Sequence, residues 1–479
     1  MPPVTSAASH RAFVIGYAIW IFGIFSYFVP AATWSPVSRF SLTRAIVENH
    51  SLRIDGFEGA SGDRALHGAH WYSDKAPVPS LLATPVYAVF HQLDRLRGTA
   101  PRFSAVGTEG FPARRVYVNG PFQRGLYVCS LATAGLAGTV LTLLLYELAR
   151  RRVGERGAFA ASALGVLATP IFPYATSFYG HVVAGAFLVG AVAALELGKA
   201  PPGAPRRRRL AGACLALAIG SEYILLFPAA LVAGLVVLGS KRRLRTLYDL
   251  GLGALVPVAV VAAYHSACFG APWRTGYSFI ARSEFAAGHA SGLLGVHAPQ
   301  RSALGGLLVG PRRGLFFVAP VAAIGLYGLG RMLLRERDTA ARTLAAAGAL
   351  LFVLNAGYYM WWGGAATGPR HLVPALGVIA LGLGGCWSRP GLRAAALVLA
   401  VPSLAFMLVL TAVGLEAPER GNVLFDYALG GLREGRIAHL SGASNLGIQL
   451  GLHPAATLGP ILVWMLVGAR VLWKRLEPS

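Results

Sequence analysis

The sequence predicts an all-α integral membrane protein with about twelve transmembrane helices and a long first extracytoplasmic loop. Hydrophobic residues make up 55% of its 479 residues, charged residues only 13%, and the mean hydropathy is +0.56. Soluble domains carry about 25% charged residues. Apolar stretches close to the roughly 20 residues that cross a bilayer recur along the chain. We therefore expect a single transmembrane domain over residues 1–479.

The formal net charge of +23 raises the question of nucleic-acid binding. The arginines lie mostly in short runs between apolar segments, which is the pattern of cytoplasmic connectors under the positive-inside rule. We therefore expect the partner of this charge to be the lipid bilayer, and no nucleic acid. The four cysteines are scattered without a CxxC pair, so we expect buried thiols rather than a disulfide or zinc framework.

The apolar run at residues 12–32 follows Arg11 and is longer than the roughly 7–15 apolar residues of a signal peptide. It is therefore expected to be an uncleaved first span. The spans are expected at residues 12–33, 124–148, 157–173, 179–198, 209–222, 224–240, 247–268, 314–334, 342–360, 372–387, 393–414 and 457–473.

Twelve spans and a cytoplasmic N-terminus place both termini in the cytoplasm. The connectors on that side are short and basic: residues 150–156, 199–209, 241–245, 331–342 and 389–393, and the tail with Lys474 and Arg475. The outer segments are residues 34–123, 174–178, 223, 269–313, 361–371 and 415–456, and they hold most of the acidic residues. We expect a multi-pass protein of a bacterial-type cytoplasmic (inner) membrane, with its active site on the extracytoplasmic face.

The first outer loop, residues 34–123, is expected to contain interfacial helices. Residues 76–93 are apolar but interrupted by three prolines, which predicts an interfacial or re-entrant segment. Phe40, Ala45, Ile46 and Val47 recur at near-helical spacing between charged residues. This spacing predicts an amphipathic helix on the membrane surface.

The same loop carries residues suited to sugar transfer from a lipid phosphate. Such a reaction needs a carboxylate to take the proton of the acceptor hydroxyl and cations to hold the departing phosphate. The candidates for the base are Asp55, Asp63 and Asp74, and those for the phosphate are Lys75, Arg39, Arg44 and Arg370. The alternative is that these are ordinary solvated loop residues.

Further candidates lie in two aromatic segments. Residues 358–371 contain Trp362, Arg370 and His371, which could stack on a sugar or bind phosphate, or form an aromatic belt with a capping arginine. His181 opens a span on the outer side and could contact substrate or be a core histidine. Glu222 is expected to end a tight turn, with structural pairing to an arginine. Residues 269–277 and 310–316 could cover the site, but turn-forming roles are favoured.

With these segments the chain resembles the GT-C superfamily of polytopic membrane glycosyltransferases, of the protein-mannosyltransferase and lipid A aminoarabinose-transferase type. The features are the long first outer loop, the segment 68–77 (GAHWYSDKAP), the basic run after the next span, the turn 174–181 (YATSFYGH) and the segment 368–371 (GPRH). The resemblance implies a polyprenyl-phosphate-linked sugar donor, an extracytoplasmic lipid, glycan or protein acceptor, and a site that includes Tyr72 and places Lys75 near the lipid phosphate.

One position departs from the family pattern. Such enzymes usually carry an acidic pair at the start of the first outer loop, where this chain has Ser35 to Arg39 (SPVSR). Asp55, Asp63 or Asp74 is therefore expected to take over as the base, with Asp55 favoured because it follows the expected surface helix.

Other function classes stay open. A transporter or flippase of lipid-linked saccharides suits twelve spans, but the two halves show no similarity. A non-catalytic scaffold would explain the missing acidic pair. The sequence has no P-loop, no HExxH and no Asp and His set at ligand spacing, so no cofactor is expected, and a divalent metal is left open.

Overall fold

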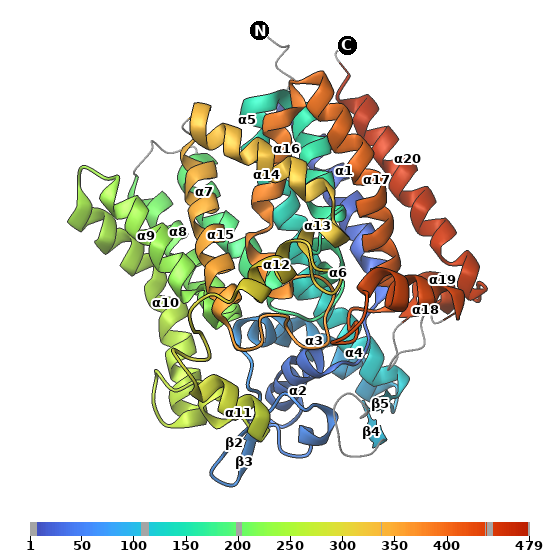
Figure 1. Cartoon of the computed structure of the whole chain (residues 1–479). Helices are drawn as coiled ribbons and strands as arrows, with labels where there is room; N and C mark the ends of the chain where they lie inside the picture. The colour runs from blue at the N-terminus through green and yellow to red at the C-terminus, as the bar shows by residue number, and fades with distance from the viewer. Residues whose placement is uncertain are drawn as a thin grey trace.

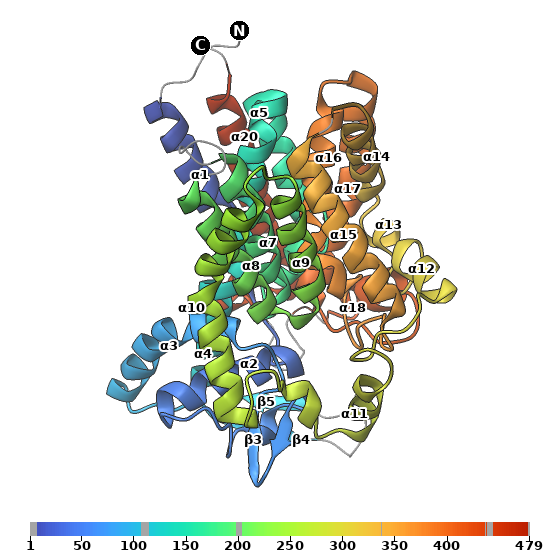
Figure 2. The same cartoon turned by 90° about the vertical axis from the view of Figure 1, so that its left-hand side faces the viewer.

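The computed structural model describes residues 7–106, 115–197, 204–336, 338–435, 437 and 444–477. A bundle of long helices has both chain ends at one extremity (Figure 1). The opposite extremity holds a smaller layer made of α2, α3, α11 and short hairpins, as the view turned by 90° also shows (Figure 2). The protein therefore has a helical body and one capping layer, and the candidate site lies where the two meet.

The first and last helices pack side by side. α1 spans Ala7–Ser26 and α20 spans Leu458–Arg475. The indole N–H of Trp20 donates to the Trp464 carbonyl at 3.1 Å, and the Trp464 indole donates to the Trp20 carbonyl at 3.1 Å. Just beyond α1, β1 (Phe28–Val29) pairs antiparallel with β6 (Ser444–Asn445). The two ends of the sequence are thus joined along one edge of the bundle.

The rest of the bundle places a helix at every segment expected to be a span. The helices are α4 (Gly120–Ser130), α5 (Leu136–Leu167), α6 (Ile171–Ala175), α7 (His181–Leu197), α8 (Pro205–Ser221), α9 (Leu226–Leu238), α10 (Arg243–Phe269), α13 (Leu315–Val318), α14 (Val321–Arg331), α15 (Thr339–Gly357), α16 (Gly377–Trp387) and α17 (Pro390–Val413). Gly154 has φ 73° and divides α5 inside the expected basic connector. In the described residues, five helical segments are long and apolar enough to cross a membrane by themselves: Ala8–Ser26, Gly120–Leu167, Arg243–Phe269, Thr339–Gly357 and Pro390–Val413.

The capping layer combines short helices and hairpins. Its helices are α2 (Trp34–Glu48), α3 (Val78–Leu96) and α11 (Ser283–Ala290), whereas α12 (Arg301–Leu308), α18 (Gly430–Arg433) and α19 (Leu446–Gln449) are short helices beside the bundle. β2 (Ala65–His67) pairs antiparallel with β3 (His70–Tyr72), and β4 (Phe103–Val106) pairs with β5 (Arg115–Val118). The Ala281 N–H donates to the Arg64 carbonyl at 3.1 Å, so the second outer loop lies against the first hairpin.

The expectation of a surface helix around Phe40 was wrong. α2 is buried on every face from Ser35 to Ala45, because α3, α4 and the first hairpin region cover it. Its polar groups bond inside the protein: the Arg39 carbonyl, for example, accepts from the Ser80 hydroxyl at 3.0 Å. Most of residues 76–93 form α3, whose Leu82 and Val89 are exposed, and the interfacial position of this segment stays a prediction. α2 therefore brings charged side chains into the interior.

Candidate functional site

A buried ion pair anchors the site to the bundle. Arg39 of α2 is 2% exposed and donates to Glu222 Oε1 at 2.8 Å, and His181 Nδ1 lies 3.3 Å from the same oxygen. Gly180 makes this approach possible, because a Cβ there would lie 2.5 Å from Glu222 Oε1 and 3.0 Å from the Arg39 guanidinium. The expected pairing of Glu222 with an arginine is confirmed, and its partner is Arg39.

Beside this pair lies a cluster centred on Lys75. The Lys75 ammonium is 2.8 Å from Asp63 Oδ2 and 3.1 Å from Asp74 Oδ2. Burial lowers the pKa of Lys75, but the two carboxylates outweigh it and raise the pKa, so the side chain is charged. Burial raises the pKa of Asp74. Gly276 of the second outer loop packs onto the Asp74 backbone, where a Cβ would meet Cα at 2.6 Å.

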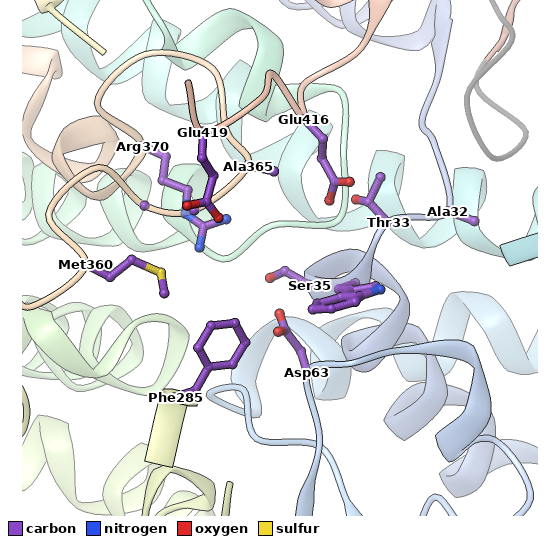
Figure 3. A pocket seen from close by; sticks show the side chains of 13 residues that line it. Ala32, Thr33, Ser35, Asp63, Phe285, Met360, Ala365, Arg370, Glu416 and Glu419 are labelled. Carbon is purple, nitrogen blue, oxygen red and sulfur yellow. The ribbon is translucent and has the colours of Figure 1, made fainter. Parts of the chain in front are cut away.

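A cavity of about 100 Å³ opens next to the cluster (Figure 3). Asp63 enters it from the first outer loop, and Glu416 and Glu419 enter from the opposite side. Arg370 lies on the same side as the glutamates. The complete lining is Ala32, Thr33, Trp34, Ser35, Asp63, Phe285, Met360, Gly363, Gly364, Ala365, Arg370, Glu416 and Glu419.

Arg313 holds two walls of this cavity together. Its side chain is fully buried and donates to the carbonyls of Trp362, Gly364 and Pro418 at 3.0, 2.7 and 3.1 Å. The Thr367 hydroxyl also donates to the Leu415 carbonyl at 2.9 Å. The segments 362–367 and 415–418 therefore run alongside each other. Arg313 has the structural role that was favoured for its segment.

Glu416 is the cavity residue that sequence reasoning missed. Burial raises the pKa of its carboxyl to about 7, while a hydrogen bond from Thr33 and the charge of Arg370 oppose the rise. Figure 3 shows the Thr33 and Glu416 side chains turned toward each other. Glu416 belongs to the segment 415–456, which is predicted to be extracytoplasmic and carries no motif, so only its acidic character could have drawn notice.

Three buried nitrogens around the site have no hydrogen-bond partner among the described residues: Arg39 Nε, Arg370 Nε and His371 Nε2. Burial and the adjacent Arg370 hold the pKa of His371 well below its usual range, so this ring is neutral. Buried polar atoms without partners are costly, and they are usually satisfied by a ligand or an ordered water. With Lys75 close by, this arrangement suits an anion.

The other predicted residues take different positions. Asp55 lies outside the cavity, where its carboxylate accepts from the Trp71 N–H at 2.8 Å and lies 2.8 Å from His70 Nδ1. Arg44 pairs with Glu48 at 2.7 Å, away from the Lys75 cluster.

Two aromatic candidates lie at the periphery. The Trp362 indole donates to Glu419 Oε2 at 3.0 Å, at the cavity wall. Tyr72 packs edge-on against Phe269, with ring centroids 5.5 Å apart. Neither side chain lines the cavity. The structure therefore gathers Asp63, Asp74, Lys75 and Arg370 and leaves Asp55 and Arg44 apart, while the functional roles of all these residues stay predictions.

A large apolar groove of about 740 Å³ runs along the bundle between α5 and α7. It begins at α3, whose first residue, Val78, follows Lys75 by three positions. Its lining is Leu82, Val86, Ala132, Thr133, Leu136, Ala137, Val140, Leu144, Val183, Ala186, Phe187, Gly190, Ala193, Ala194, Leu197, Leu210 and Cys214. The helix that follows the Lys75 cluster thus contributes to the wall of the groove.

The overall fold is that of the GT-C superfamily, as two solved proteins show. One similar solved structure is ArnT from Cupriavidus metallidurans bound to undecaprenyl phosphate, with a TM-score of 0.56 and 15% identity over 98% of this chain and 76% of that one. The same protein in the apo state gives a TM-score of 0.53 and 16% identity over the same shares.

A second similar structure is the Archaeoglobus fulgidus oligosaccharyltransferase in complex with Zn and sulfate, with a TM-score of 0.50 and 14% identity over 89% of this chain and 55% of that one. No family model and no curated protein matches the sequence. In the described ranges, no three His, Cys, Asp or Glu side chains are grouped as a metal would require. The predicted GT-C fold is confirmed.

Proposed function

We propose that this protein is a membrane glycosyltransferase that moves a sugar from a polyprenyl-phosphate-linked donor to an acceptor hydroxyl on the extracytoplasmic face. The observation that carries the proposal is the partly buried Lys75 ammonium, which pairs with a carboxylate of the polar cavity and is followed by α3, the helix that lines one part of an apolar groove. A lipid-linked sugar has the same three parts in the same order: an apolar chain, a phosphate and a polar sugar. The GT-C fold, shared with a protein bound to undecaprenyl phosphate, supports this reading.

In this proposal the donor phosphate lies against Lys75, with Arg370 and His371 completing its surroundings. Lys75 is charged, and Arg370 Nε and His371 Nε2 are buried without partners in the described structure. Cations held in a water-poor site stabilise the charge that develops on the departing phosphate. Arg39 and His181 hold the wall behind them through Glu222.

The polyprenyl chain would follow the groove between α5 and α7. Leu82 and Val86 of α3 line its near end, and Leu197 and Leu210 line its far end. Burial of apolar surface contributes roughly 25 cal/mol per Å², so a long chain in this groove supplies much of the binding energy.

The proton of the acceptor would be taken by a carboxylate that lines the cavity. Of the three predicted aspartates only Asp63 does so, among the residues that the structure describes. The acceptor, a lipid, glycan or protein, would approach from the outer side. The proposal includes twelve spans with both termini in the cytoplasm, as the basic connectors indicate.

Native mass spectrometry of the purified full-length protein tests the lipid site. We expect added undecaprenyl phosphate to bind wild type, and Lys75→Ala to weaken this binding by about tenfold or more, because a hydrogen bond to a charged group contributes roughly 1.5–3 kcal/mol. Arg370→Gln should also weaken it, and this change breaks no ion pair among the described residues. Lys241→Ala, at an exposed lysine in a basic connector, is the matched control and should bind as wild type does.

Transfer is tested with a synthetic panel of undecaprenyl-phosphate hexoses and pentoses and a cell-envelope extract as acceptor. The expected result is release of undecaprenyl phosphate by wild type from at least one donor. If neither wild type nor any variant retained added lipid, the carrier assignment would fail. Movement of the labelled lipid across proteoliposomes without any release would identify a transporter instead.

A further inference from the structure

We infer that Glu416 is the general base that removes the proton from the acceptor hydroxyl. This inference rests on the proposed function and assigns the proton-accepting role within it. It replaces the expectation that an aspartate of the first outer loop is the base. Glu416 comes from the segment after α17, far along the chain from the first outer loop.

The position of Glu416 meets the first requirement of a base, which is access to the reacting atoms. Its carboxylate lines the same cavity as Arg370 and Asp63, and Figure 3 shows it on the wall opposite Asp63. A hydroxyl that enters this space lies between the Glu416 carboxylate and the cations proposed to hold the donor phosphate. General-base catalysis needs this direct reach, of about 3 Å, to the proton.

The three carboxylates of the cavity, Asp63, Glu416 and Glu419, differ in their partners. Asp63 is engaged with the Lys75 ammonium at 2.8 Å, and Glu419 accepts the Trp362 indole N–H at 3.0 Å. The Glu416 carboxylate lies beside a neutral hydroxyl, that of Thr33. Asp63 is thus held in an ion pair that orients Lys75, whereas Glu416 forms no ion pair among the described residues.

The electrostatic surroundings also favour Glu416. The groups that face it are Arg370, Asp63, Tyr174 and Tyr179, from three other segments. Burial outweighs the positive charge of Arg370 and brings the pKa of the Glu416 carboxyl to about 7. A base whose pKa lies near the working pH combines a large deprotonated fraction with strong proton affinity.

Glu416 takes the place of the acidic pair that the family resemblance leads one to expect at residues 35–39. Ser35, at the place where the resemblance leads one to expect an acid, lines this same cavity. Glu416 reaches the cavity from another wall, beside Thr33. The chain thus provides a carboxylate in the same space from a different segment.

The step balances without a further reactant. The acceptor oxygen forms a bond to the anomeric carbon as the bond from that carbon to the phosphate oxygen breaks. The electron pair of the broken bond leaves with the polyprenyl phosphate, whose added charge faces Lys75 and Arg370. The proton of the acceptor moves to the Glu416 carboxylate and is later released to water. Displacement from the side opposite the phosphate inverts the anomeric configuration.

Release of undecaprenyl phosphate from the active panel donor tests the inference in the purified full-length protein. Glu416→Gln keeps the shape of the side chain but cannot take a proton, so we expect the rate to fall at least 100-fold while undecaprenyl phosphate binds within about twofold of wild type. Glu416→Asp should keep part of the rate. Glu477→Gln, at the opposite end of the protein, is the matched control and should leave the rate unchanged.

Two further readouts separate a base from a structural residue. The wild-type rate should rise with pH through about 7, as the Glu416 carboxyl loses its proton, and this rise should be absent in Glu416→Gln. Added formate should restore part of the rate of Glu416→Ala by serving as an external base.

The outcomes distinguish this inference from the proposed function. A Glu416→Gln rate within threefold of wild type, with loss of the rate in Asp63→Asn, would overturn the role of Glu416 and leave the transferase standing with Asp63 as its base. Absence of release by wild type from every donor would overturn both. Loss of undecaprenyl phosphate binding in Glu416→Gln would identify a structural residue and also refute the inference.

Discussion

Gly180 decides whether the buried charges of this site can meet. A Cβ at this position would lie 2.4 Å from the Ser221 carbonyl and 2.5 Å from Glu222 Oε1. Both contacts are shorter than any side chain tolerates, and one of them is to backbone. The sequence segment 174–181 drew attention to His181, but the residue before it sets the distance between α7 and the turn at Glu222.

We therefore predict that Gly180→Ala lowers stability by about 1–3 kcal/mol, the usual cost of overpacking, and separates Arg39 from Glu222. The measurement is the thermal unfolding midpoint in detergent. The control is Gly234→Ala in α9, where an added Cβ meets nothing within 4 Å and alanine favours the helix. An unchanged midpoint in Gly180→Ala would contradict the close packing described here.

Single residues also show the reach of sequence reasoning. Lys75, Asp63 and Asp74 stand in one polar segment, and the structure joins them in one cluster, because neighbours in a short hairpin region stay close. Glu416 could not be placed with them from the sequence. Its position depends on the pairing of residues 364–367 with 415–418 and on the buried Arg313, contacts between segments with no shared pattern.

At the scale of elements, the proposed function places the lipid tail in the groove between α5 and α7, apart from the lipid phosphate. Gly190 of α7 lines this groove, and a Cβ there would meet only ordinary contacts, at 3.6 Å from Cys214 and 3.8 Å from Leu144. A larger side chain can therefore enter the groove at this point without disturbing the backbone. This makes the length of the lipid a variable that can be tested.

We predict that Gly190→Leu weakens binding of undecaprenyl phosphate several-fold and leaves binding of a ten-carbon isoprenyl phosphate unchanged. The short lipid reaches the phosphate site but not the middle of the groove. Gly234→Leu, on the open side of α9, should affect neither lipid. Equal weakening of both lipids in Gly190→Leu, measured by native mass spectrometry, would show that the tail does not follow this groove.

Hydropathy predicted the positions of the helices more accurately than it predicted which helices are buried. Each expected span contains a helix, and Gly154 breaks α5 within the expected basic connector. The burial of α2 was not predictable, because some of its polar residues find partners in other segments of the chain. Arg39 meets Glu222, and Ser38 shares a hydrogen bond with Ser73. A helix with polar residues on several faces has the same pattern in sequence whether water or protein surrounds it.

On the scale of the whole molecule, the arrangement of termini and loops predicts how the protein is oriented across the membrane. Both termini lie at one extremity and the candidate site lies toward the other (Figures 1 and 2). The exposed Lys241 and Lys474 belong to connectors predicted to be cytoplasmic, and the exposed Arg53 belongs to the first outer loop. The short basic connectors predict that the site faces outward.

Labelling of intact cells with a membrane-impermeant maleimide checks this orientation. In a background where the four native cysteines are replaced, we expect Arg53→Cys to be labelled and Lys241→Cys and Lys474→Cys to be labelled only after the membrane is opened. Retained lipid binding in the cysteine-free protein serves as the control for folding. Labelling of Lys474→Cys in intact cells would reverse the proposed topology.

The contact between α1 and α20 also has a consequence for the synthesis of the chain. Trp20 and Trp464 are 444 positions apart, and each indole bonds to the backbone of the other helix. A ribosome adds about 5–20 residues per second, so the first helix waits on the order of half a minute or more for its partner to be made. Throughout that interval the bundle is incomplete. A messenger RNA truncated near its 3′ end would therefore give a chain in which α1 lacks its partner α20.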